Sequence, residues 1–522
     1  MNFKQNTLKL MACLLLTISC IMPLHAQEQA HKLYENVSKD SLMFLTYFNK
    51  DQFTSELLAE FLSEFTSNIK SELIQSAKEV CLYGHKDGAF NHYTVQFRGI
   101  EQIQLSQVDE ILKKNNLTIE ELNPTYAIIN GGKYRKGIFW FNKEYFELKI
   151  FAQIEPIDGT LKKEYNRLIN ILHTAVSYDM GYEDIAFKLD SLDRLDSVNS
   201  ALSFKALLAT EKNALSRQVK HQVDFTEVFD EHTDDCGALL YINPQHAGAI
   251  PYHVYNVLGS EIPELYEHSS LTAGLMQHYE EVWLKLSANA QQITASSIAV
   301  NKATLPSFNQ PIDKQIAKYL PANTQALYIY NANLAAFKNN LASYLDYKDF
   351  DREERAIARL ALLAFDDELA KHLGNGFIAV TDSSLNGRDM PDFKAAIHMP
   401  NRQKGATLLS ILQNDLELIK KVSEDVYTFQ PEKLGSDKHL YLNTRHSTWL
   451  LGTGTPAGLE RTLSPTELKQ HYPELFTGKT SQFLFFDAST LSSSKIDFQK
   501  VQLKTQILKK NRIKTTVSID LK

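Results

Sequence analysis

Short apolar runs of strand length dominate the hydropathy pattern of this chain. The clearest group covers residues 126–129, 138–141 and 145–151, and the runs are separated by Asn130-Gly131-Gly132 and Asn142-Lys143. Both separators favour tight turns, so this spacing predicts an antiparallel meander. Strands of similar character are expected at residues 42–48, 80–84, 93–97, 238–243, 282–287, 293–300, 376–381, 393–399, 426–429, 439–442, 448–451, 482–486, 498–508 and 513–521.

Helical spacing of apolar residues, every three or four positions, separates several of these strands. Helices are predicted at residues 52–78, 105–115, 161–176, 203–215, 353–373, 404–421 and 456–469. Strands joined by hairpins imply antiparallel sheets, which bury one face against helices. The predicted fold class is therefore α+β, with two related halves of antiparallel sheets and helices packed on one face. A doubly wound nucleotide-binding fold is not expected.

Two distant stretches share one pattern of a short apolar strand followed by an amphipathic helix. They are residues 42–61, LMFLTYFNKDQFTSELLAEF, and residues 326–345, ALYIYNANLAAFKNNLASYL. Aligning their first residues pairs Phe53 with Phe337, and other apolar positions fall in step. This similarity predicts an internal repeat in which each stretch opens one half of the protein.

The repeat and the composition together predict the domain organisation. A chain of 522 residues is too long for one compact core. The N-terminal half is expected at residues 27–302 and the C-terminal half at residues 321–522. Residues 303–320, which contain Pro306 and Pro311, are expected to connect them.

The first 26 residues have the composition of a secretory signal peptide. Lys4 and Lys9 form a basic start, residues 10–22 form an apolar run, and Ala26 offers a small residue for cleavage. The run is shorter than the ~20 residues that span a bilayer. We expect cleavage after Ala26 and export to the periplasm or the cell surface.

A lipid anchor at Cys20 is the alternative, although Thr17 is a poor match to the residue usual in a lipoprotein signal. No later segment has ~20 uninterrupted apolar residues, so no transmembrane helix is expected in the mature chain. Cleavage would leave Cys81 and Cys236. Export permits a disulfide between them, but two buried free thiols fit equally well.

Charge and composition exclude some classes of function. The apolar share of 43% and the charged share of 22% are ordinary for folded protein. The net charge of -7 argues against a nucleic-acid binder, which needs a basic face. The 28 Phe, 23 Tyr and three Trp are expected mainly in the core, although exposed ones could bind a glycan or a peptide.

A glycine-containing loop at residues 450–458 is the most tempting ligand motif. It joins a predicted strand to a predicted helix, where backbone amides can hold a phosphate. The spacing differs from that of dinucleotide-binding loops, and no P-loop lysine follows. We interpret the loop as a turn in which Thr455 caps the helix and Pro456 takes its first position.

Three other groups of residues have some features of a site. Ser492 and Lys495 match the SxxK spacing of some serine acyl-enzymes, but the partner motifs are absent. Asp190, Asp193 and Asp196 alternate with leucines, as on the solvated side of a helix. Six histidines lack metal-ligand spacing and are expected in solvated loops: His221, His232, His246, His253, His268 and His278. No metal, cofactor or catalytic residue is predicted.

Several segments resemble an uncharacterised family of exported bacterial proteins with paired α+β repeats. The similar segments are PANTQALYIYNANLAAFKNNL at residues 321–341, SVNSALSFKALLATEK at 197–212 and GIFWFNKEYFELKI at 137–150. The resemblance extends over most of residues 35–522 and implies a cell-envelope location and a repeated architecture. No activity is established for that family, so it assigns no site residues.

These features predict an exported cell-envelope protein that is a non-enzymatic binding or structural protein, with its partner in a groove between sheet and helices. An envelope protein, a glycan or an apolar ligand is the expected partner, and nucleic acid is not. Two alternatives stay open. One is an envelope hydrolase with a dispersed active site, and the other is a chaperone-like carrier of an apolar ligand.

Overall fold

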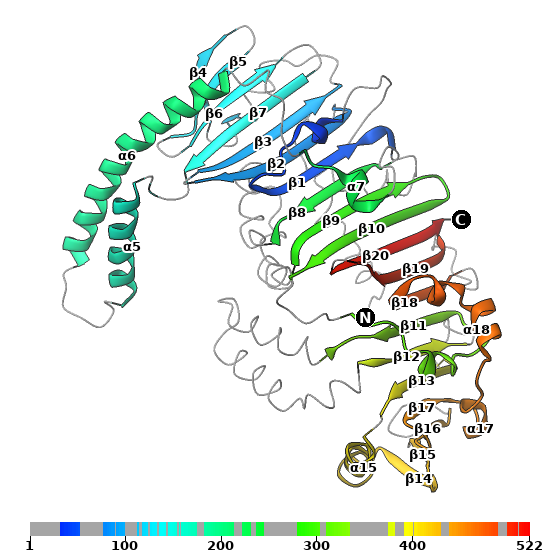
Figure 1. Ribbon diagram of the computed structural model, residues 1–522. Helices are drawn as coiled ribbons and strands as arrows, with labels where there is room; N and C mark the ends of the chain where they lie inside the picture. Colours follow the sequence, from blue (N-terminus) through cyan, green and yellow to red (C-terminus); the bar gives the residue numbers. More distant parts are fainter. Residues whose placement is uncertain are drawn as a thin grey trace. The chain divides into compact units, whose positions relative to one another are not determined.

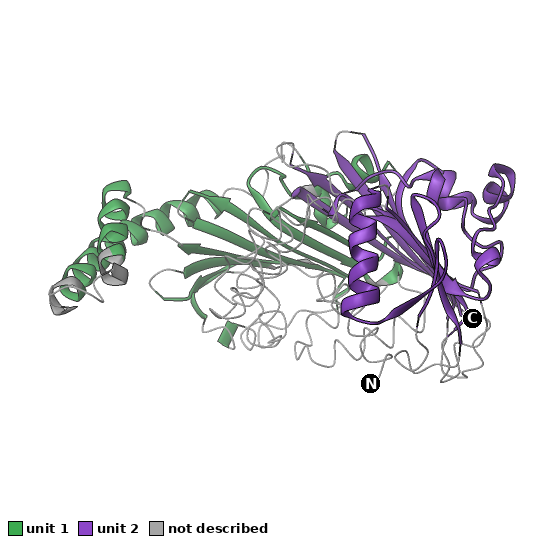
Figure 2. Cartoon of the chain, turned by 90° about the horizontal axis from the view of Figure 1, so that it is seen from below, with its two compact units in different colours: residues 1–269 green, residues 270–522 purple. Residues whose placement is uncertain are grey.

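The chain forms two compact units, Met1–Ser269 and Ser270–Lys522 (Figure 2). The computed structural model describes residues 32–52, 77–88, 90–99, 112–113, 117–123, 126–132, 135–141, 145–153, 156, 158–174, 182–212, 222–230, 236–244, 279–302, 309–334, 374–381, 391–399, 401–429, 438–488, 498–509 and 511–521. Both units combine antiparallel sheet with helices, which confirms the predicted α+β class.

The first unit contains an antiparallel sheet in the order β8–β1–β2–β3–β7–β6–β5–β4 (Figure 1). Its described strands are β1 (Leu42–Asn49), β2 (Glu79–Asp87), β3 (Phe90–Arg98), β4 (Thr118–Leu122), β5 (Tyr126–Asn130), β6 (Arg135–Phe141), β7 (Tyr145–Gln153) and β8 (Ala238–Ile242).

The strand β1 is buried between two neighbours because its sequence is apolar at nearly every position. It pairs with β2 on one side and β8 on the other. Phe44 and Tyr47, which point to opposite faces of the sheet, are both fully buried. Gly84 of β2 makes room for the Phe44 ring, since a Cβ there would lie 2.7 Å from Phe44 Cε1.

Among the described residues, the longer helices of the first unit lie between β7 and β8. The short segments are η1 (Leu33–Asn36), η2 (Lys50–Gln52) and α7 (Phe225–Phe229). The long ones are α5 (Gly159–Thr174) and α6 (Tyr182–Lys212), which contact each other (Figure 1). The α6 helix replaces the shorter helix predicted at residues 203–215 and includes the three aspartates discussed above.

The second unit has a larger antiparallel sheet, in the order β9–β10–β20–β19–β18–β11–β12–β13–β17–β16–β15–β14 (Figure 1). Its described strands are β9 (Tyr279–Ala288), β10 (Gln292–Asn301), β11 (Ala326–Asn331), β12 (Asn375–Val380), β13 (Phe393–His398), β14 (Ile419–Ser423), β15 (Val426–Phe429), β16 (Leu440–Asn443), β17 (Thr448–Thr453), β18 (Lys479–Asp487), β19 (Phe498–Ile507) and β20 (Arg512–Leu521).

The described helices of the second unit are short. They are α11 (Lys314–Ala317), α15 (Arg402–Ser410), the π-helix η5 (Ile411–Asp415), α17 (Pro456–Leu459), α18 (Pro465–His471) and η6 (Pro473–Phe476). Several cap residues match their sequence signatures. Ser464 and Glu467 form a reciprocal capping box at the start of α18, and Asn401 caps α15.

The two units share one strand order over eight strands. The order in the first unit is β8–β1–β2–β3–β7–β6–β5–β4. The corresponding order in the second unit, strand for strand, is β18–β11–β12–β13–β17–β16–β15–β14. The opening strands β1 and β11, which the predicted repeat pairs in sequence, thus have equivalent neighbours. Phe53 and Phe337, in the helices predicted after these strands, lie outside the described residues.

The hairpin of β9 and β10 differs from the predicted organisation. It falls in residues 27–302, which were assigned to the N-terminal half. In the structure, β10 pairs with the last strand, β20, and both belong to the second unit. A hairpin can join a sheet edge far away in sequence, and only the tertiary structure reveals which edge it joins. The connection predicted at residues 303–320 lies within the second unit and is described only from residue 309.

Several predicted element boundaries were wrong. The helix predicted at residues 404–421 ends at Asp415, and Ile419–Ser423 forms the edge strand β14. The helix predicted at 456–469 is two helices, because residues 461–464 between α17 and α18 are not helical. The strand β4 was not predicted, since its sequence lacks apolar alternation.

Candidate functional site

The inner face of α6 is buried against the first unit's sheet. Phe204 of α6 lies in an apolar cluster with side chains from β3, β5, β6 and β7, and Leu207 and Leu208 pack against it. The ring of Phe204 meets that of Phe90 edge-on, with centroids 5.2 Å apart. The remaining members of the cluster are Ile128, Ile138, Trp140 and Phe151.

Polar side chains also attach α6 to the strand β7. Asp196, only 6% exposed, accepts a hydrogen bond of 2.6 Å from Gln153 Nε2. Ser200 donates to the Asp196 carbonyl at 2.6 Å and also contacts Gln153 Oε1. Near the end of α6, Lys149 Nζ forms an ion pair of 2.7 Å with Glu211 Oε1. These contacts hold the helix at two points and so fix which face turns outward.

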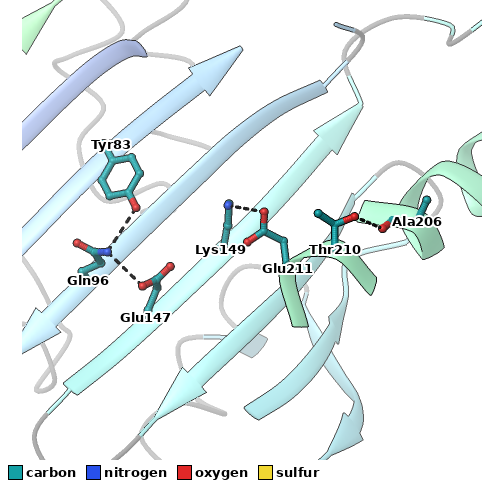
Figure 3. A network of polar contacts seen from close by, with 7 residues as sticks. All are labelled: Tyr83, Gln96, Glu147, Lys149, Ala206, Thr210 and Glu211. Atoms are coloured by element: carbon teal, nitrogen blue, oxygen red, sulfur yellow. Dashed lines mark hydrogen bonds and ion pairs between the residues drawn. The ribbon is translucent and has the colours of Figure 1, made fainter. Parts of the chain in front are cut away.

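The polar contacts continue across the same face of the sheet, from β7 to β2 (Figure 3). Gln96 of β3 donates to Tyr83 Oη at 3.3 Å and to Glu147 Oε2 at 3.1 Å. Thr94 lies between Tyr83 and Lys149 in the register and is fully buried. The network therefore joins three strands through side chains as well as through backbone pairing.

Burial disfavours the charged forms of three groups on this face, His92, Cys81 and Tyr83. Desolvation lowers the pKa of His92 to about 4, and nearby Lys149 adds to the effect. Desolvation also raises the pKa of the Cys81 thiol and of the Tyr83 hydroxyl well above their ordinary values. A nucleophile or a general base needs an accessible charged or readily titrated group near neutral pH. These three groups do not meet that requirement.

The outer face of α6 carries a row of exposed apolar side chains. Phe187 is 73% exposed, Leu195 58%, Val198 62% and Leu202 65%. Their spacing places them on one stripe, opposite Asp196, Ser200 and Phe204. Single exposed apolar residues are ordinary, but several on one stripe mark an interaction surface. We call these four residues the outer stripe of α6.

A second buried polar group lies in the other unit. Lys394 of β13 is 7% exposed and donates to the Arg461 carbonyl at 3.0 Å. Its ammonium lies 5.9 Å from the centre of the Tyr319 ring. Desolvation, with a contribution from Arg461, lowers the pKa of Lys394 to about 8. These contacts tie the loop after α17 to the sheet, which is a structural role.

The three aspartates predicted on a solvated helix face do not all lie there. Asp190 is exposed and pairs with Arg194 at 2.8 Å along α6, as expected. Asp196 is buried, and neighbouring Leu195 is exposed, so the predicted inner and outer sides are reversed at this point. The reversal arises because Gln153, distant in sequence, supplies the hydrogen bond that Asp196 needs when buried.

The glycine-containing loop at residues 450–458 leads into a capped helix start, as predicted from its sequence. Thr455 Oγ1 accepts a hydrogen bond of 3.2 Å from the Gly458 amide, and Pro456 occupies the first turn of α17. Leu459, at the end of that turn, is buried in the second unit's core. This segment is a capped helix start of four residues, too short to present an array of amides to a phosphate.

Other predicted sites fall partly or wholly outside the described residues. Cys20, Ser492, Lys495 and the six histidines between residues 221 and 278 lie there. Cys81 and Cys236 are both buried, and no disulfide joins them. Over the described residues, no three His, Cys, Asp or Glu side chains are arranged to hold a metal ion. No helix in that part of the chain is long and apolar enough to cross a membrane.

The attachment of α6 and its outer stripe were not found from the sequence. Lys149, Gln153 and Glu211 carry no local motif, because their partners are distant in the chain. The stripe did leave a signal in the seven-residue spacing of Leu195 and Leu202 with Val198 between them. That spacing also fits an inward face, and only the packing of Phe204 decides between the two.

Comparisons with known proteins give a distant likeness to solved structures. No protein-family model matches the chain, and no curated protein does. One crystal form of TP0453, a Treponema protein, is 11% identical with a TM-score of 0.23, over 54% of this chain and 83% of that chain. Another form is 10% identical with a TM-score of 0.25, over 54% and 84%. TM-scores this low carry no argument about function.

Proposed function

We propose that this chain is an exported, non-enzymatic binding protein of the cell envelope, and that the first unit displays α6 as its contact surface. The outer stripe of α6 is the observation that carries the proposal. Four large apolar side chains face outward on a helix whose other face is already packed and hydrogen-bonded. Such a surface is costly to leave in water, so a partner is expected to cover it.

The way α6 is held supports a binding role. The Lys149–Glu211 ion pair and the contacts of Gln153 with Asp196 and Ser200 fix its rotation about the helix axis. A helix fixed in this way presents the outer stripe without further ordering, which lowers the entropic cost of association. The site therefore differs from the predicted groove between sheet and helices, because it lies on the outside of a helix.

The polar face of the sheet gives less support to the envelope hydrolase. Its histidine, tyrosine and cysteine are buried, and desolvation disfavours their charged forms. The hydrogen bonds of Gln96 and Glu147 cross-link the strands. We therefore assign this face the task of holding the sheet and α6 together.

The cellular location of the protein is also part of the proposal. The basic start, the apolar run and Ala26 support export by a cleaved signal peptide. Cys20 remains the alternative point of attachment to lipid. Mass spectrometry of the mature N-terminus tests this, because a chain that begins at Gln27 excludes the lipid anchor at Cys20.

We further infer that the two units descend from one duplicated α+β unit. The shared order of eight strands and the paired sequences at residues 42–61 and 326–345 support this inference. The resemblance to exported proteins with paired repeats fits the same history. In this account, α6 is an elaboration of one copy, which is how a repeated scaffold gains a binding surface on one side.

Protection of α6 in the native envelope tests the binding role. Leu195→Cys or Leu202→Cys is labelled with a maleimide in intact envelopes and in dilute purified protein. We expect labelling at least about tenfold slower in envelopes, since the outer stripe is covered there. Val422→Cys is the matched control, because Val422 is 56% exposed on the other unit's edge strand. Cys81 and Cys236 are buried and add little background.

Equal labelling of the α6 cysteines in envelopes and in dilute solution contradicts the proposal. So does slower labelling of Val422→Cys by the same factor, since that result indicates general shielding. Circular dichroism of each variant checks that α6 remains folded.

A further inference from the structure

The outer stripe of α6 has the spacing of a two-helix seam. Leu195, Leu202 and Ala209 follow one another at seven-residue intervals, and so do Ser191, Val198 and Lys205. These two series alternate at intervals of four and three, the heptad pattern by which helices pack against one another. Apart from Ser191, which is half-buried, all these residues are exposed. The stripe is therefore narrow and long, and it fits a helix better than a broad surface.

Charges in and beside the seam complement each other when the helix is reversed. Asp190, which also pairs with Arg194 of its own helix at 2.8 Å, lies eight residues before Val198. Lys205 of the seam lies seven residues after Val198, on the same side. In an antiparallel pair of identical helices centred on Val198, Asp190 of each helix faces Lys205 of the other. In a parallel pair, Lys205 faces Lys205, which is unfavourable because like charges repel.

Side-chain sizes along the seam show the same complementarity. Phe187 lies eleven residues before Val198 and Ala209 lies eleven residues after it. An antiparallel pair places the large ring of one helix on the small side chain of the other, at both ends. A parallel pair places two Phe187 rings together and leaves a gap between two alanines. Large-against-small packing fills space without strain.

We propose that the outer stripe of α6 docks onto the same stripe of a second copy of this chain, as an antiparallel helix pair centred on Val198. The inference rests on the proposed function, which makes the stripe a contact surface, and it names the partner. The interface is isologous, so each contact occurs twice about a two-fold axis. The seam from Phe187 to Ala209 is about 33 Å long, at ~1.5 Å per residue.

Disulfide cross-linking of the full mature chain tests the geometry. A two-fold axis through the centre places the two copies of residue 198 side by side, so Val198→Cys should form a covalent dimer under mild oxidation. Phe187→Cys alone should not, because its two copies lie at opposite ends. A mixture of Phe187→Cys and Ala209→Cys chains should cross-link to each other. Efficient cross-linking of Phe187→Cys to itself overturns the antiparallel arrangement.

Charge exchange gives a second test that does not require a disulfide. Lys205→Asp alone should weaken the dimer about two- to tenfold, since it removes attraction and adds repulsion at two places. Asp190→Lys should weaken it by a similar factor, and it also removes the ion pair with Arg194 within α6. The double variant should restore the dissociation constant to within about twofold of the wild type, by sedimentation equilibrium. A double variant weaker than both single variants overturns the pairing of Asp190 with Lys205.

The remaining outcomes separate this inference from the proposed function. Leu195→Glu with Leu202→Glu should abolish the dimer, whereas Val422→Glu should not. A wild-type chain that stays monomeric at all concentrations, with no Val198→Cys cross-link, overturns the inference. If that chain instead co-sediments with phosphatidylglycerol vesicles and the double glutamate variant does not, the stripe binds lipid. The function then stands without the dimer. Unprotected cysteines in the envelope overturn the proposed function itself.

Discussion

The connection from β7 to β8 and the connection from β17 to β18 occupy equivalent places in the two strand orders, yet they are built differently. In the second unit, the short helices α17 and α18 turn their apolar side chains inward. Leu459, Leu468 and Tyr472 all belong to the buried core there. In the first unit, the 31-residue helix α6 is apolar on both sides. Only its inner face meets the sheet.

This difference shows which apolar side chains the fold requires and which it does not. A connection that only closes the sheet needs one apolar face, and α17 and α18 have that. The outer stripe of α6 adds nothing to the first unit's core, since its members remain more than half exposed. The proposed partner would account for its apolar character, and the comparison can be tested by substituting the two faces separately.

The largest expected effect comes from the inner face of α6. Phe204→Ala should lower the free energy of unfolding of the first unit by about 3–5 kcal/mol, because it opens a cavity among Phe90, Trp140 and Phe151. Phe187→Ala in the same helix should change it by about 0.5 kcal/mol or less, since Phe187 is exposed. Hydrogen-exchange mass spectrometry of α6 peptides in dilute protein measures both. Similar losses from the two variants would mean that the faces are not distinct.

A smaller effect is expected from His92, which ties the first unit's stability to pH. The folded-state pKa of about 4 lies below the ordinary value of 6.5. The unfolded chain therefore gains a proton as the pH falls below 6.5, while the folded chain does not until about 4. Stability is lost across that window, by up to about 3 kcal/mol. Above pH 6.5, the contribution of His92 to the free energy of unfolding is constant.

The variant His92→Gln isolates this effect. Its stability should fall less than that of the wild type between pH 6.5 and pH 4, as measured by hydrogen exchange of β3 and β7 peptides. Peptides of β11 and β18 in the second unit serve as the internal reference. Parallel curves for the two proteins would show that His92 is not responsible.

The predictability of these features depends on how local their causes are. The strands at residues 145–151 and 482–486 could be predicted, because their apolar runs and turns lie within a few residues. The cap at Thr455 could be predicted for the same reason. The edge strand β4 could not, since it is mostly exposed and depends on pairing with β5. The residues of β14 have the spacing of a helix end, whereas in the structure they pair with β15.

The candidate site was less predictable than the fold, for a physical reason. The spacing of apolar residues shows that a helix has an apolar stripe. It does not show whether that stripe or the opposite side of the helix packs against the sheet. On α6, the choice is made by Gln153 and Lys149, which bond Asp196 and Glu211 from a strand distant in sequence. The Asp196 carboxylate, which its sequence context predicts to be exposed, is therefore buried, and the neighbouring Leu195 is exposed.

The smallest expected effect comes from the cap of α18, and it tests the other side of the comparison. Seven residues are too few to form a stable helix alone, so α18 relies on its capping box and on burial of Leu468. Ser464→Ala removes the acceptor for the Glu467 amide and should cost about 1 kcal/mol. Ser464→Asp should restore most of it, because aspartate caps as well as serine. Exchange of α18 peptides should report the loss and that of α6 peptides should not. If Ser464→Asp exchanges as fast as Ser464→Ala, the capping box does not hold α18, and its buried leucine alone fixes the helix.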